Sequence, residues 1–358
     1  MNPTARPCHL ITGGAGFIGS CHVLHTRRQH INAVTVDKLT YSGNMKNLAA
    51  LANDPEHAFV HGDIGNAELM AHVLRQYRPR AVINFAAESH VDRSIHDPDI
   101  FVRTNVLGTC TLLRATLDYW RGLPEPEREA FRFLHVSTDE VFGSLHLGDP
   151  AFTEETPYAP NSPYSASKAA SDHLARAFHE TYGLPVLITN CSNNYGPRQF
   201  PEKLIPLVLC RALARESLPV YGAGANIRDW LHVEDHCEAI STVLAHGTPG
   251  RTYNIGGRSE RSNLEVVRAL CALLDTVRPH PDGPYADLVT FVTDRPGHDF
   301  RYAIDCSRME RELGWSPRHS FASGLESTVR WYLENQDWVR DVQSGAYRQW
   351  MHTNYATR

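Results

Sequence analysis

The chain has 358 residues, a formal net charge of −5 and 42% hydrophobic residues, a composition typical of a globular protein with a large core. A weakly acidic chain has no overall attraction to nucleic acid or to an anionic membrane surface, and no run approaches the roughly 18 apolar residues of a membrane span. The eight cysteines stand singly and the 20 histidines show no spacing typical of zinc ligands, so we expect reduced thiols, no metal site and a cytoplasmic location.

The first 195 residues alternate short apolar runs with longer amphipathic segments. The apolar runs predict strands at residues 8–12, 33–37, 57–61, 81–85, 132–137 and 185–191. The amphipathic segments predict helices at residues 17–29, 66–77, 98–120 and 163–182. This alternation predicts an α/β fold of the Rossmann type, with helices on both faces of a doubly wound parallel sheet.

Beyond residue 195 the elements become shorter and turn signals become frequent. Ser262 and Glu265 form a capping-box pattern before an apolar helical stretch, and residues 233–246 have the pattern of a helix that returns to the first lobe. These segments predict a smaller, mixed α/β lobe. We therefore expect residues 1–195 and 230–256 to form the Rossmann lobe, and residues 196–229 and 257–358 to form the smaller lobe.

A glycine pattern follows the first predicted strand directly. Gly13, Gly16 and Gly19 stand in a G-x-x-G-x-x-G spacing, and Phe17 and Ile18 open the helix that follows. Glycines at these positions allow the backbone to approach a pyrophosphate, which the free N–H groups of the helix start can bind. Because the pattern lies between a strand and a helix, it predicts a dinucleotide site rather than an ordinary tight turn.

Three further positions at strand ends complete the predicted cofactor site. Asp37 ends the second strand, where a carboxylate accepts from ribose hydroxyls and repels a 2′-phosphate, so NAD is favoured over NADP. Asp63 and Ile64 follow the third strand and are expected at the adenine, although Asp63 equally suits a helix cap. Ala86 follows the fourth strand, where a small residue suits either the nicotinamide half of the cofactor or simple helix–sheet packing.

The segment after the fifth predicted strand carries an acid and a base beside a phenol. Thr138, Asp139 and Glu140 follow the strand, and Tyr164 and Lys168 lie four residues apart on one face of the next helix. An ammonium beside a phenol is expected to lower the phenol pKa. Consecutive residues of a strand point to opposite faces, so both carboxyl groups can serve one site only if the chain turns near Ser137. A solvated acidic turn is the alternative interpretation.

Together these segments resemble the extended short-chain dehydrogenase/reductase family, whose members modify nucleotide sugars on a tightly held nicotinamide cofactor. Within this family the resemblance is to the 4,6-dehydratases. The matching motifs lie at residues 13–19, 86–94, 137–143, 164–168, 193–197, 200–206 and 227–236.

The resemblance implies a mechanism on dTDP-glucose. Tyr164, helped by Lys168 and Thr138, takes the 4-hydroxyl proton while hydride passes from C4 to NAD⁺. Glu140 then removes the C5 proton, Asp139 protonates the departing 6-hydroxyl, and hydride returns to C6. UDP- or CDP-glucose as the substrate, a 4-epimerase, a UDP-glucuronate decarboxylase and a non-catalytic NAD-binding regulator are the alternatives.

The resemblance also implies that the smaller lobe supplies most contacts to the nucleotide sugar. Ser89, at the end of the fourth strand, is placed to reach a sugar hydroxyl. The other implied substrate-binding residues are Asn193 and Lys203 on the sugar and phosphate side, Arg228, Arg295 and His298 at the diphosphate, Tyr221 and Asn263 at the nucleoside, and Leu204. A surface ion pair is the alternative for either arginine.

Four positions depart from the family pattern, namely Gly65, Asn66, Gln199 and Phe300. They leave the nucleobase preference open. The resemblance further implies a homodimer in which residues 98–120 and 163–182 of two subunits pack as a four-helix bundle. Apolar positions such as Leu113 and Leu117 suit an internal core equally well.

Overall fold

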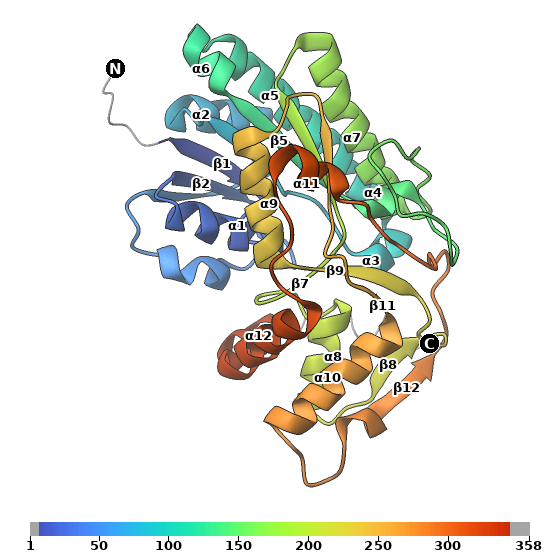
Figure 1. Ribbon diagram of the computed structural model, residues 1–358. Helices are drawn as coiled ribbons and strands as arrows, with labels where there is room; N and C mark the ends of the chain where they lie inside the picture. The colour runs from blue at the N-terminus through green and yellow to red at the C-terminus, as the bar shows by residue number, and fades with distance from the viewer. Residues whose placement is uncertain (1–6, 344–358) are drawn as a thin grey trace.

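The predicted apolar runs become neighbouring strands of one parallel sheet in the computed structural model, which describes residues 7–343 (Figure 1). Each of the six runs is a strand to within one residue of its expected limits. Within the described residues a seventh strand joins the edge. In spatial order the strands are β10 (Thr252–Ile255), β6 (Val186–Cys191), β5 (Arg132–Thr138), β4 (Ala81–Asn84), β1 (Cys8–Thr12), β2 (Asn32–Asp37) and β3 (His57–His61).

The strand order reverses between β1 and β4, which pair in parallel with Thr12 opposite Asn84. In an open parallel sheet, the loops at the carboxyl ends of the strands separate at such a point and leave a crevice for a ligand. The glycine turn, Asp37 and the Asp139–Glu140 pair all follow strands at this edge. The topology therefore brings the predicted cofactor and catalytic segments to one place.

Helices cover both faces of this sheet, as the alternation predicts, and each face has its own apolar core. One face carries α2 (Ala67–Tyr77), α5 (Thr109–Arg121) and α7 (Pro163–Tyr182), and the other carries α1 (Phe17–Arg28), η1 (Met45–Leu51), α9 (Val233–His246) and α11 (Ser307–Leu313). Three short helices belong to the connections between the larger elements: α3 (Val91–His96), α6 (Glu125–Ala130) and η3 (Asp139–Phe142). No helix within residues 7–343 is long and apolar enough to cross a bilayer.

The prediction of a single α-helix at residues 98–120 is wrong in one respect, because the middle of this segment is a π-helix. The segment divides into α4 (Pro98–Phe101), the π-helical turn η2 (Val102–Gly108) and α5. Asn105 in η2 exchanges two hydrogen bonds with the backbone of Glu88, at 2.8 and 2.9 Å, and donates a third to Ser167 Oγ at 2.8 Å. The wide turn thus ties a loop at the sheet edge to helix α7.

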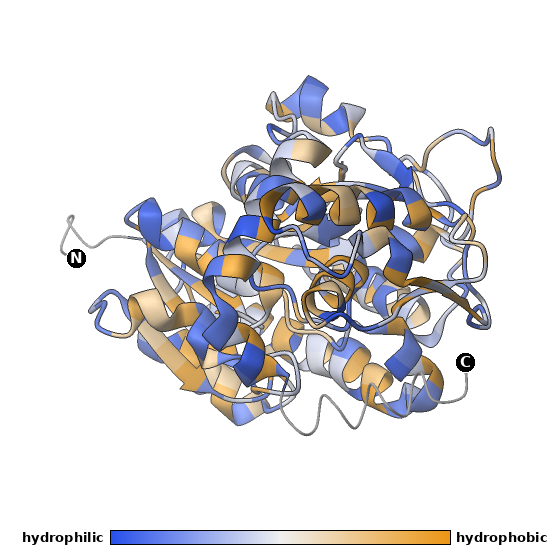
Figure 2. Cartoon of the chain, turned by 90° about the horizontal axis from the view of Figure 1, so that it is seen from below, coloured by the Kyte–Doolittle hydropathy of each residue, from blue (hydrophilic) through white to orange (hydrophobic). Residues whose placement is uncertain are grey.

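The smaller lobe lies below the sheet in Figure 1 and has an apolar core of its own. Its α10 begins with the predicted capping box, in which Ser262 and Glu265 each accept from the other's backbone N–H. Figure 2 shows hydrophobic and hydrophilic residues alternating along single helices, as expected where one helix face packs on a core. The elements of this lobe are β7 (Asn193–Tyr195), α8 (Leu204–Leu213), β8 (Leu218–Tyr221), β9 (Ile227–His232), β11 (Glu260–Ser262), α10 (Asn263–Val277), η4 (Tyr285–Leu288), β12 (Val289–Val292), α12 (Phe321–Glu334) and α13 (Gln336–Val342).

Gly19 sets how closely helix α1 can approach the turn after β1. A Cβ atom at this position would lie 2.2 Å from the carbonyl oxygen of Gly13, which is a backbone atom and cannot move aside cheaply. We expect Gly19→Ala to destabilise the fold by about 1–3 kcal/mol through this overpacking. Thermal unfolding of the variant and the parent checks the expectation.

Gly122→Ala is the matched control, because Gly122 has a φ of −83° and its nearest neighbour to an added Cβ lies at 3.5 Å. The control should unfold within about 0.5 kcal/mol of the parent. Equal Tm values for the two variants would mean that the approach of α1 to the turn is not close enough to matter.

Candidate active site

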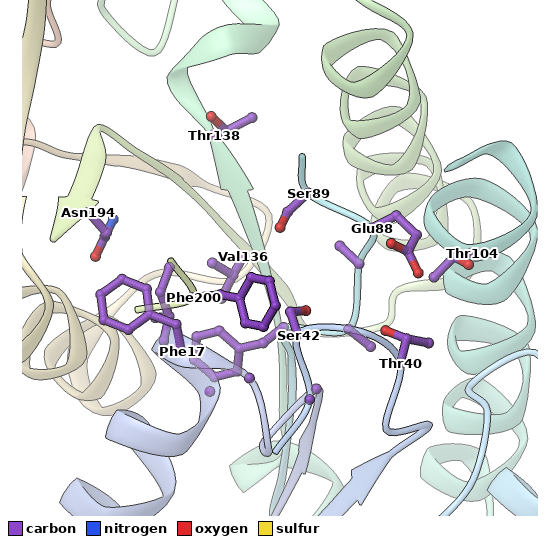
Figure 3. Close-up of a pocket in the computed structure, with 18 of the residues that line it drawn as sticks. Phe17, Thr40, Ser42, Glu88, Ser89, Thr104, Val136, Thr138, Asn194 and Phe200 are labelled. Atoms are coloured by element: carbon purple, nitrogen blue, oxygen red, sulfur yellow. The ribbon is translucent and has the colours of Figure 1, made fainter. Parts of the chain in front are cut away.

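One pocket joins the predicted cofactor and catalytic residues at the carboxyl edge of the sheet (Figure 3). It has a volume of about 270 Å³. All predicted cofactor-binding and catalytic residues line it: Gly13, Gly16, Phe17, Ile18, Gly19, Asp37, Asp63, Ile64, Ala86, Thr138, Asp139, Glu140, Tyr164 and Lys168. Among the predicted substrate-binding residues, Ser89, Asn193 and Lys203 line the pocket, whereas Leu204, Tyr221, Arg228, Asn263, Arg295 and His298 do not.

The cofactor end of the pocket is built on backbone packed too closely for side chains. A Cβ at Gly13, whose φ is +69°, would lie 2.7 Å from the backbone nitrogen of Ala86. The carboxylate of Asp37 accepts from Ala15 N at 2.9 Å and from Leu39 N at 2.8 Å, which fixes it at the end of β2. A bare backbone floor with a fixed carboxylate at one side fits a dinucleotide that has a free ribose 2′-hydroxyl.

A second hydrogen-bond chain supports the glycine turn from behind. Asn47 donates to Ala15 O at 2.8 Å, and Trp338 on α13 donates from its indole nitrogen to Asn47 Oδ1 at 2.7 Å. Asn47 is 2% exposed, so this chain is shielded from water. The glycine turn is therefore held in part by Trp338, which lies near the other end of the described chain.

Asp63 is not the cap of helix α2. That role belongs to Asn66, whose side chain accepts from Leu69 N at 3.0 Å. Asp63 instead accepts from Gly65 N at 2.8 Å and pairs with Lys38 at 2.7 Å. The unexpected Gly65-Asn66 pair therefore completes a tight turn and a helix start, and Asp63 remains at the pocket wall.

The chain leaves the strand and turns directly before Asp139 and Glu140, as expected for two carboxyl groups that serve one site. Strand β5 ends at Thr138, one residue later than expected, and the short helix η3 begins at Asp139. Thr138 Oγ1 accepts from Glu140 N at 3.3 Å and caps this helix. Because Asp139 and Glu140 lie in a helical turn rather than in a strand, both side chains can line the same pocket.

The two carboxyl groups differ in their electrostatic surroundings. Asp139 is 1% exposed, and burial followed by the neighbouring charge of Glu140 raises its pKa well above the usual value. Burial also raises the pKa of Glu140, but the cations of Arg295, Lys203 and Arg228 oppose that rise. The arrangement therefore favours a proton on Asp139 and a negative charge on Glu140.

The expectation that Lys168 lowers the pKa of Tyr164 is wrong for this structure. Burial and then the charge of Glu140 raise the pKa of Tyr164 well above 10, against a hydrogen bond with Thr138 that lowers it. The ammonium of Lys168 donates to Val136 O at 2.8 Å and is itself buried. Desolvation thus determines the direction in which the Tyr164 pKa shifts, an effect that sequence spacing does not reveal.

The sequence analysis did not identify a buried polar cluster that contacts Lys168. His135 Nε2 lies 3.4 Å from Lys168 Nζ and 3.3 Å from Asp172 Oδ1, and Asp172 Oδ2 accepts from Ser137 at 2.7 Å and from Tyr158 at 3.0 Å. Asp172 follows Lys168 by four residues and so lies on the same face of α7. That spacing, together with a histidine in an otherwise apolar strand, is the signal that identifies the cluster.

Of the predicted substrate-binding cations, Lys203 lines the pocket, whereas Arg228 and Arg295 lie outside its wall. Lys203 donates to Ser89 O at 2.8 Å. Arg228 is 5% exposed and donates to Asp299 O at 2.9 Å, with its guanidinium 4.2 Å from the centroid of the Tyr302 ring. A surface ion pair is therefore excluded for Arg228.

Asp92, which the sequence did not single out as a binding residue, connects two predicted nucleotide contacts. Its Oδ2 accepts from Tyr221 at 3.1 Å, and its Oδ1 lies 3.5 Å from Arg295 Nη1. Tyr221 also meets His298 edge to face, with ring centroids 6.1 Å apart. Asn263 opens α10 and donates its backbone N–H to Asn226 O at 2.9 Å, and Leu204 opens α8.

The loop after Asp37 was also missed. Figure 3 shows Thr40 and Ser42 at one side of the pocket, which Phe17 and Phe200 also line. Tyr41 lines the pocket as well, with the Arg93 guanidinium 3.8 Å from its ring centroid. The Tyr-Ser-Gly sequence at residues 41–43, which begins four residues after Asp37, is the signal in the sequence.

The other two departures from the family pattern, Gln199 and Phe300, differ in their relation to the pocket. Gln199 lines the pocket and donates to Asn194 O at 2.8 Å. Phe300 is 36% exposed and lies outside the pocket wall, where its backbone N–H donates to Ser144. Neither residue contacts the Asp139–Glu140 turn through a hydrogen bond that we observe within residues 7–343.

Comparison with known proteins agrees with this geometry. The family model described as GDP-mannose 4,6 dehydratase matches residues 10–328. The chain is 62% identical over 341 residues to a dTDP-glucose 4,6-dehydratase of Xanthomonas campestris pv. campestris, covering 95% of this chain and 97% of the relative. It is 52% identical to dTDP-glucose 4,6-dehydratase 1 of Escherichia coli K12, covering 98% and 99%.

Among solved structures, a dTDP-glucose 4,6-dehydratase from Streptomyces venezuelae, determined with NAD bound, superposes with a TM-score of 0.84. It is 48% identical in sequence, and the match covers 94% of this chain and 99% of that one. Both the sequence and the fold therefore agree with the motifs at residues 13–19, 137–143 and 164–168. The chain belongs to the GDP-mannose 4,6 dehydratase family of short-chain dehydrogenases/reductases.

Proposed function

We propose that this protein is an NAD-dependent dTDP-glucose 4,6-dehydratase, which converts dTDP-glucose to dTDP-4-keto-6-deoxyglucose and water. The observation that carries the proposal is the buried Asp139–Glu140 turn, which lines the same pocket as Tyr164. The similarity to dTDP-glucose 4,6-dehydratases at 52–62% identity supports the choice of substrate. Hydroxide is a poor leaving group, so a reaction that expels it requires a placed acid, which a 4-epimerase does not need.

Each group at the pocket has one task. When bound, NAD accepts and later returns a hydride, and its nicotinamide ring brings a positive charge that opposes the raised pKa of Tyr164. Tyr164 accepts the proton of the sugar 4-hydroxyl, with Thr138 hydrogen-bonded at the same oxygen. Glu140, kept ionised by the cations of the smaller lobe, removes the C5 proton that the 4-ketone acidifies. Asp139, kept protonated by burial, donates its proton to the leaving 6-hydroxyl.

The remaining predicted residues are assigned by their position around this centre. Lys168, held by Val136 O and His135, positions the cofactor side of the site. Ser89, Asn193, Lys203 and Leu204 serve the sugar, because three of them line the pocket and the fourth follows Lys203. We assign Arg228, Arg295 and His298 to the diphosphate, and Tyr221 and Asn263 to the nucleoside, since guanidinium groups suit phosphate oxygens.

The lobe boundaries follow the same argument. We propose that residues 1–195 and 230–256 bind the cofactor and that residues 196–229 and 257–358 bind the nucleotide sugar. Strand β10 in the large sheet and helix α9 on its face support the return at residues 230–256. The outer limits at residues 1 and 358 lie outside the described residues, and the cytoplasmic location stays a prediction.

An apolar face supports the proposed homodimer. Ile95, Ile100, Val102 and Leu107, on α3, α4 and η2, are between 38% and 58% exposed. Leu113 and Leu117 on α5 are instead buried in the core of their own subunit. Packing residues 98–120 and 163–182 against a second subunit would cover the exposed group.

Incubation with a panel of nucleotide sugars tests the proposed function. With dTDP-glucose we expect a 4-keto-6-deoxy product and no free reduced cofactor, because the hydride is returned in each turnover. UDP-glucose, CDP-glucose and GDP-mannose serve as comparison substrates, and mass spectrometry of the products gives the loss of water. A galactose configuration without loss of water would identify an epimerase instead.

Glu140→Gln should stop elimination but leave oxidation at C4. We expect the dehydration rate to fall by roughly 10²–10⁴ because the base is lost, and exchange of the C5 hydrogen with deuterated solvent to stop. Burial raises the pKa of Glu140. Because only the ionised form accepts a proton, wild-type dehydration should decline as the pH falls through this raised value, and C4 oxidation by the variant should lack that decline.

Glu68→Gln, on the exposed surface of α2, is the control and should retain full dehydration. Undiminished dehydration or continued C5 exchange in Glu140→Gln would remove Glu140 from the mechanism.

Leu107→Asp should convert the dimer to a monomer, because Leu107 is 58% exposed in a single subunit and a carboxylate disfavours burial in an apolar interface. Molar mass from light scattering during gel filtration gives the result. A wild-type protein that is monomeric at micromolar concentration would contradict the bundle, as would a fully dimeric variant.

A further inference from the structure

The elements β9, α9 and α12 meet near the centre of the molecule (Figure 1). Three side chains of types that can bind a metal lie close together there, and none of them lines the active-site pocket. His232 ends β9, Glu234 lies in the first turn of α9, and His319 immediately precedes the N-cap of α12. One ligand atom from each residue lies within 4.8 Å of the others. Within residues 7–343 this is the one group of three such residues at that spacing.

His232 is buried without a partner at this junction. It is 3% exposed, and neither ring nitrogen has a hydrogen-bond partner among the described residues. Its ring packs against the ring of His319, with centroids 4.1 Å apart. A buried polar nitrogen without a hydrogen-bond partner is destabilising, so a ligand that binds this nitrogen is favoured.

His319 is oriented as metal-bound histidines usually are. Its Nδ1 lies 2.8 Å from Asp235 Oδ1, and the other carboxylate oxygen of Asp235 accepts from the backbone N–H groups of Arg318 and His319. Asp235 thereby holds the proton on Nδ1 and leaves Nε2 as the acceptor. A histidine that donates one ring N–H to a carboxylate while its other nitrogen binds metal is the usual arrangement around zinc.

We propose that His232, Glu234 and His319 bind a Zn²⁺ ion. Two imidazoles and one carboxylate suit zinc, with water as a fourth ligand on the exposed side. Tetrahedral zinc places its ligand atoms about 3.3 Å apart, so the group must contract. Glu234 can supply this movement, because its side chain is 49% exposed and its Oε2 already lies 3.9 Å from His319 Nε2.

The ion has a structural role at the back of the active site. β9 pairs with β7, where Asn194 lies opposite Leu231, and Asn194 lines the pocket. A metal at this position links the end of β9 and the start of α9 to the segment before α12. The two carboxylates of Glu234 and Asp235 balance the charge of a divalent cation. The sequence does not reveal this site, because His319 follows Glu234 only after 85 positions.

Titration of chelator-treated protein with ZnCl₂ in a calorimeter tests the site. Wild type should bind one Zn²⁺ per chain with a defined affinity, and His319→Gln and Glu234→Gln should each weaken that binding at least about tenfold. Both residues are partly exposed and lie outside the catalytic machinery, so the variants should fold and keep their dehydratase activity. His72→Gln, an exposed histidine on α2, is the control and should bind as wild type does.

Two additional measurements separate the outcomes. Co²⁺ should give the visible absorption of a tetrahedral site in wild type and in His72→Gln but not in His319→Gln. MgCl₂ should give no matching heat, because Mg²⁺ prefers oxygen ligands. Equal Zn²⁺ binding by wild type and His319→Gln, or equal binding of Zn²⁺ and Mg²⁺, would overturn the proposal.

Discussion

Two adjacent carboxyl groups buried in one turn cannot both carry a negative charge at low cost, and the proposed chemistry depends on this constraint. Burial raises the pKa of Asp139 well above its usual value, whereas the cations of the smaller lobe oppose the rise in the pKa of Glu140. Lys203 precedes α8, Arg228 lies on β9 and Arg295 follows β12. The division between acid and base therefore exists only when the smaller lobe is packed against the end of β5.

The same packing raises the pKa of the Tyr164 phenol. Tyr164 is 8% exposed and lies in a pocket with a net excess of carboxylates near its oxygen. Lys168 is anchored to the backbone of β5 and to His135, and this anchor fixes its position without making Tyr164 acidic. Deprotonation of the Tyr164 phenol, which the proposed mechanism requires, is therefore opposed by its burial and by the neighbouring carboxylates.

Much of this architecture could be predicted from local sequence patterns. The six strands, the helix at residues 163–182 and the turn after Ser137 follow from periodicity, proline positions and the alternation of side chains along a strand. The wide turn at residues 102–108 could not, because it exists through bonds from Asn105 to Glu88 and Ser167, which are distant in the sequence. The raised pKa of Tyr164 and the cluster around Asp172 were missed for a related reason, since burial is a property of the folded chain.

The hydrogen bond between Trp338 and Asn47 joins a late part of the chain to its first glycine turn. A ribosome delivers residues 7–60 long before residue 338, so the turn that cradles the dinucleotide leaves the exit tunnel without its rear support. Nascent chains that end before α13 should therefore hold nucleotide poorly even though every residue in direct reach of it has been synthesised. Tight cofactor retention thus becomes a late event in biosynthesis, reserved for chains whose translation has passed the far helix.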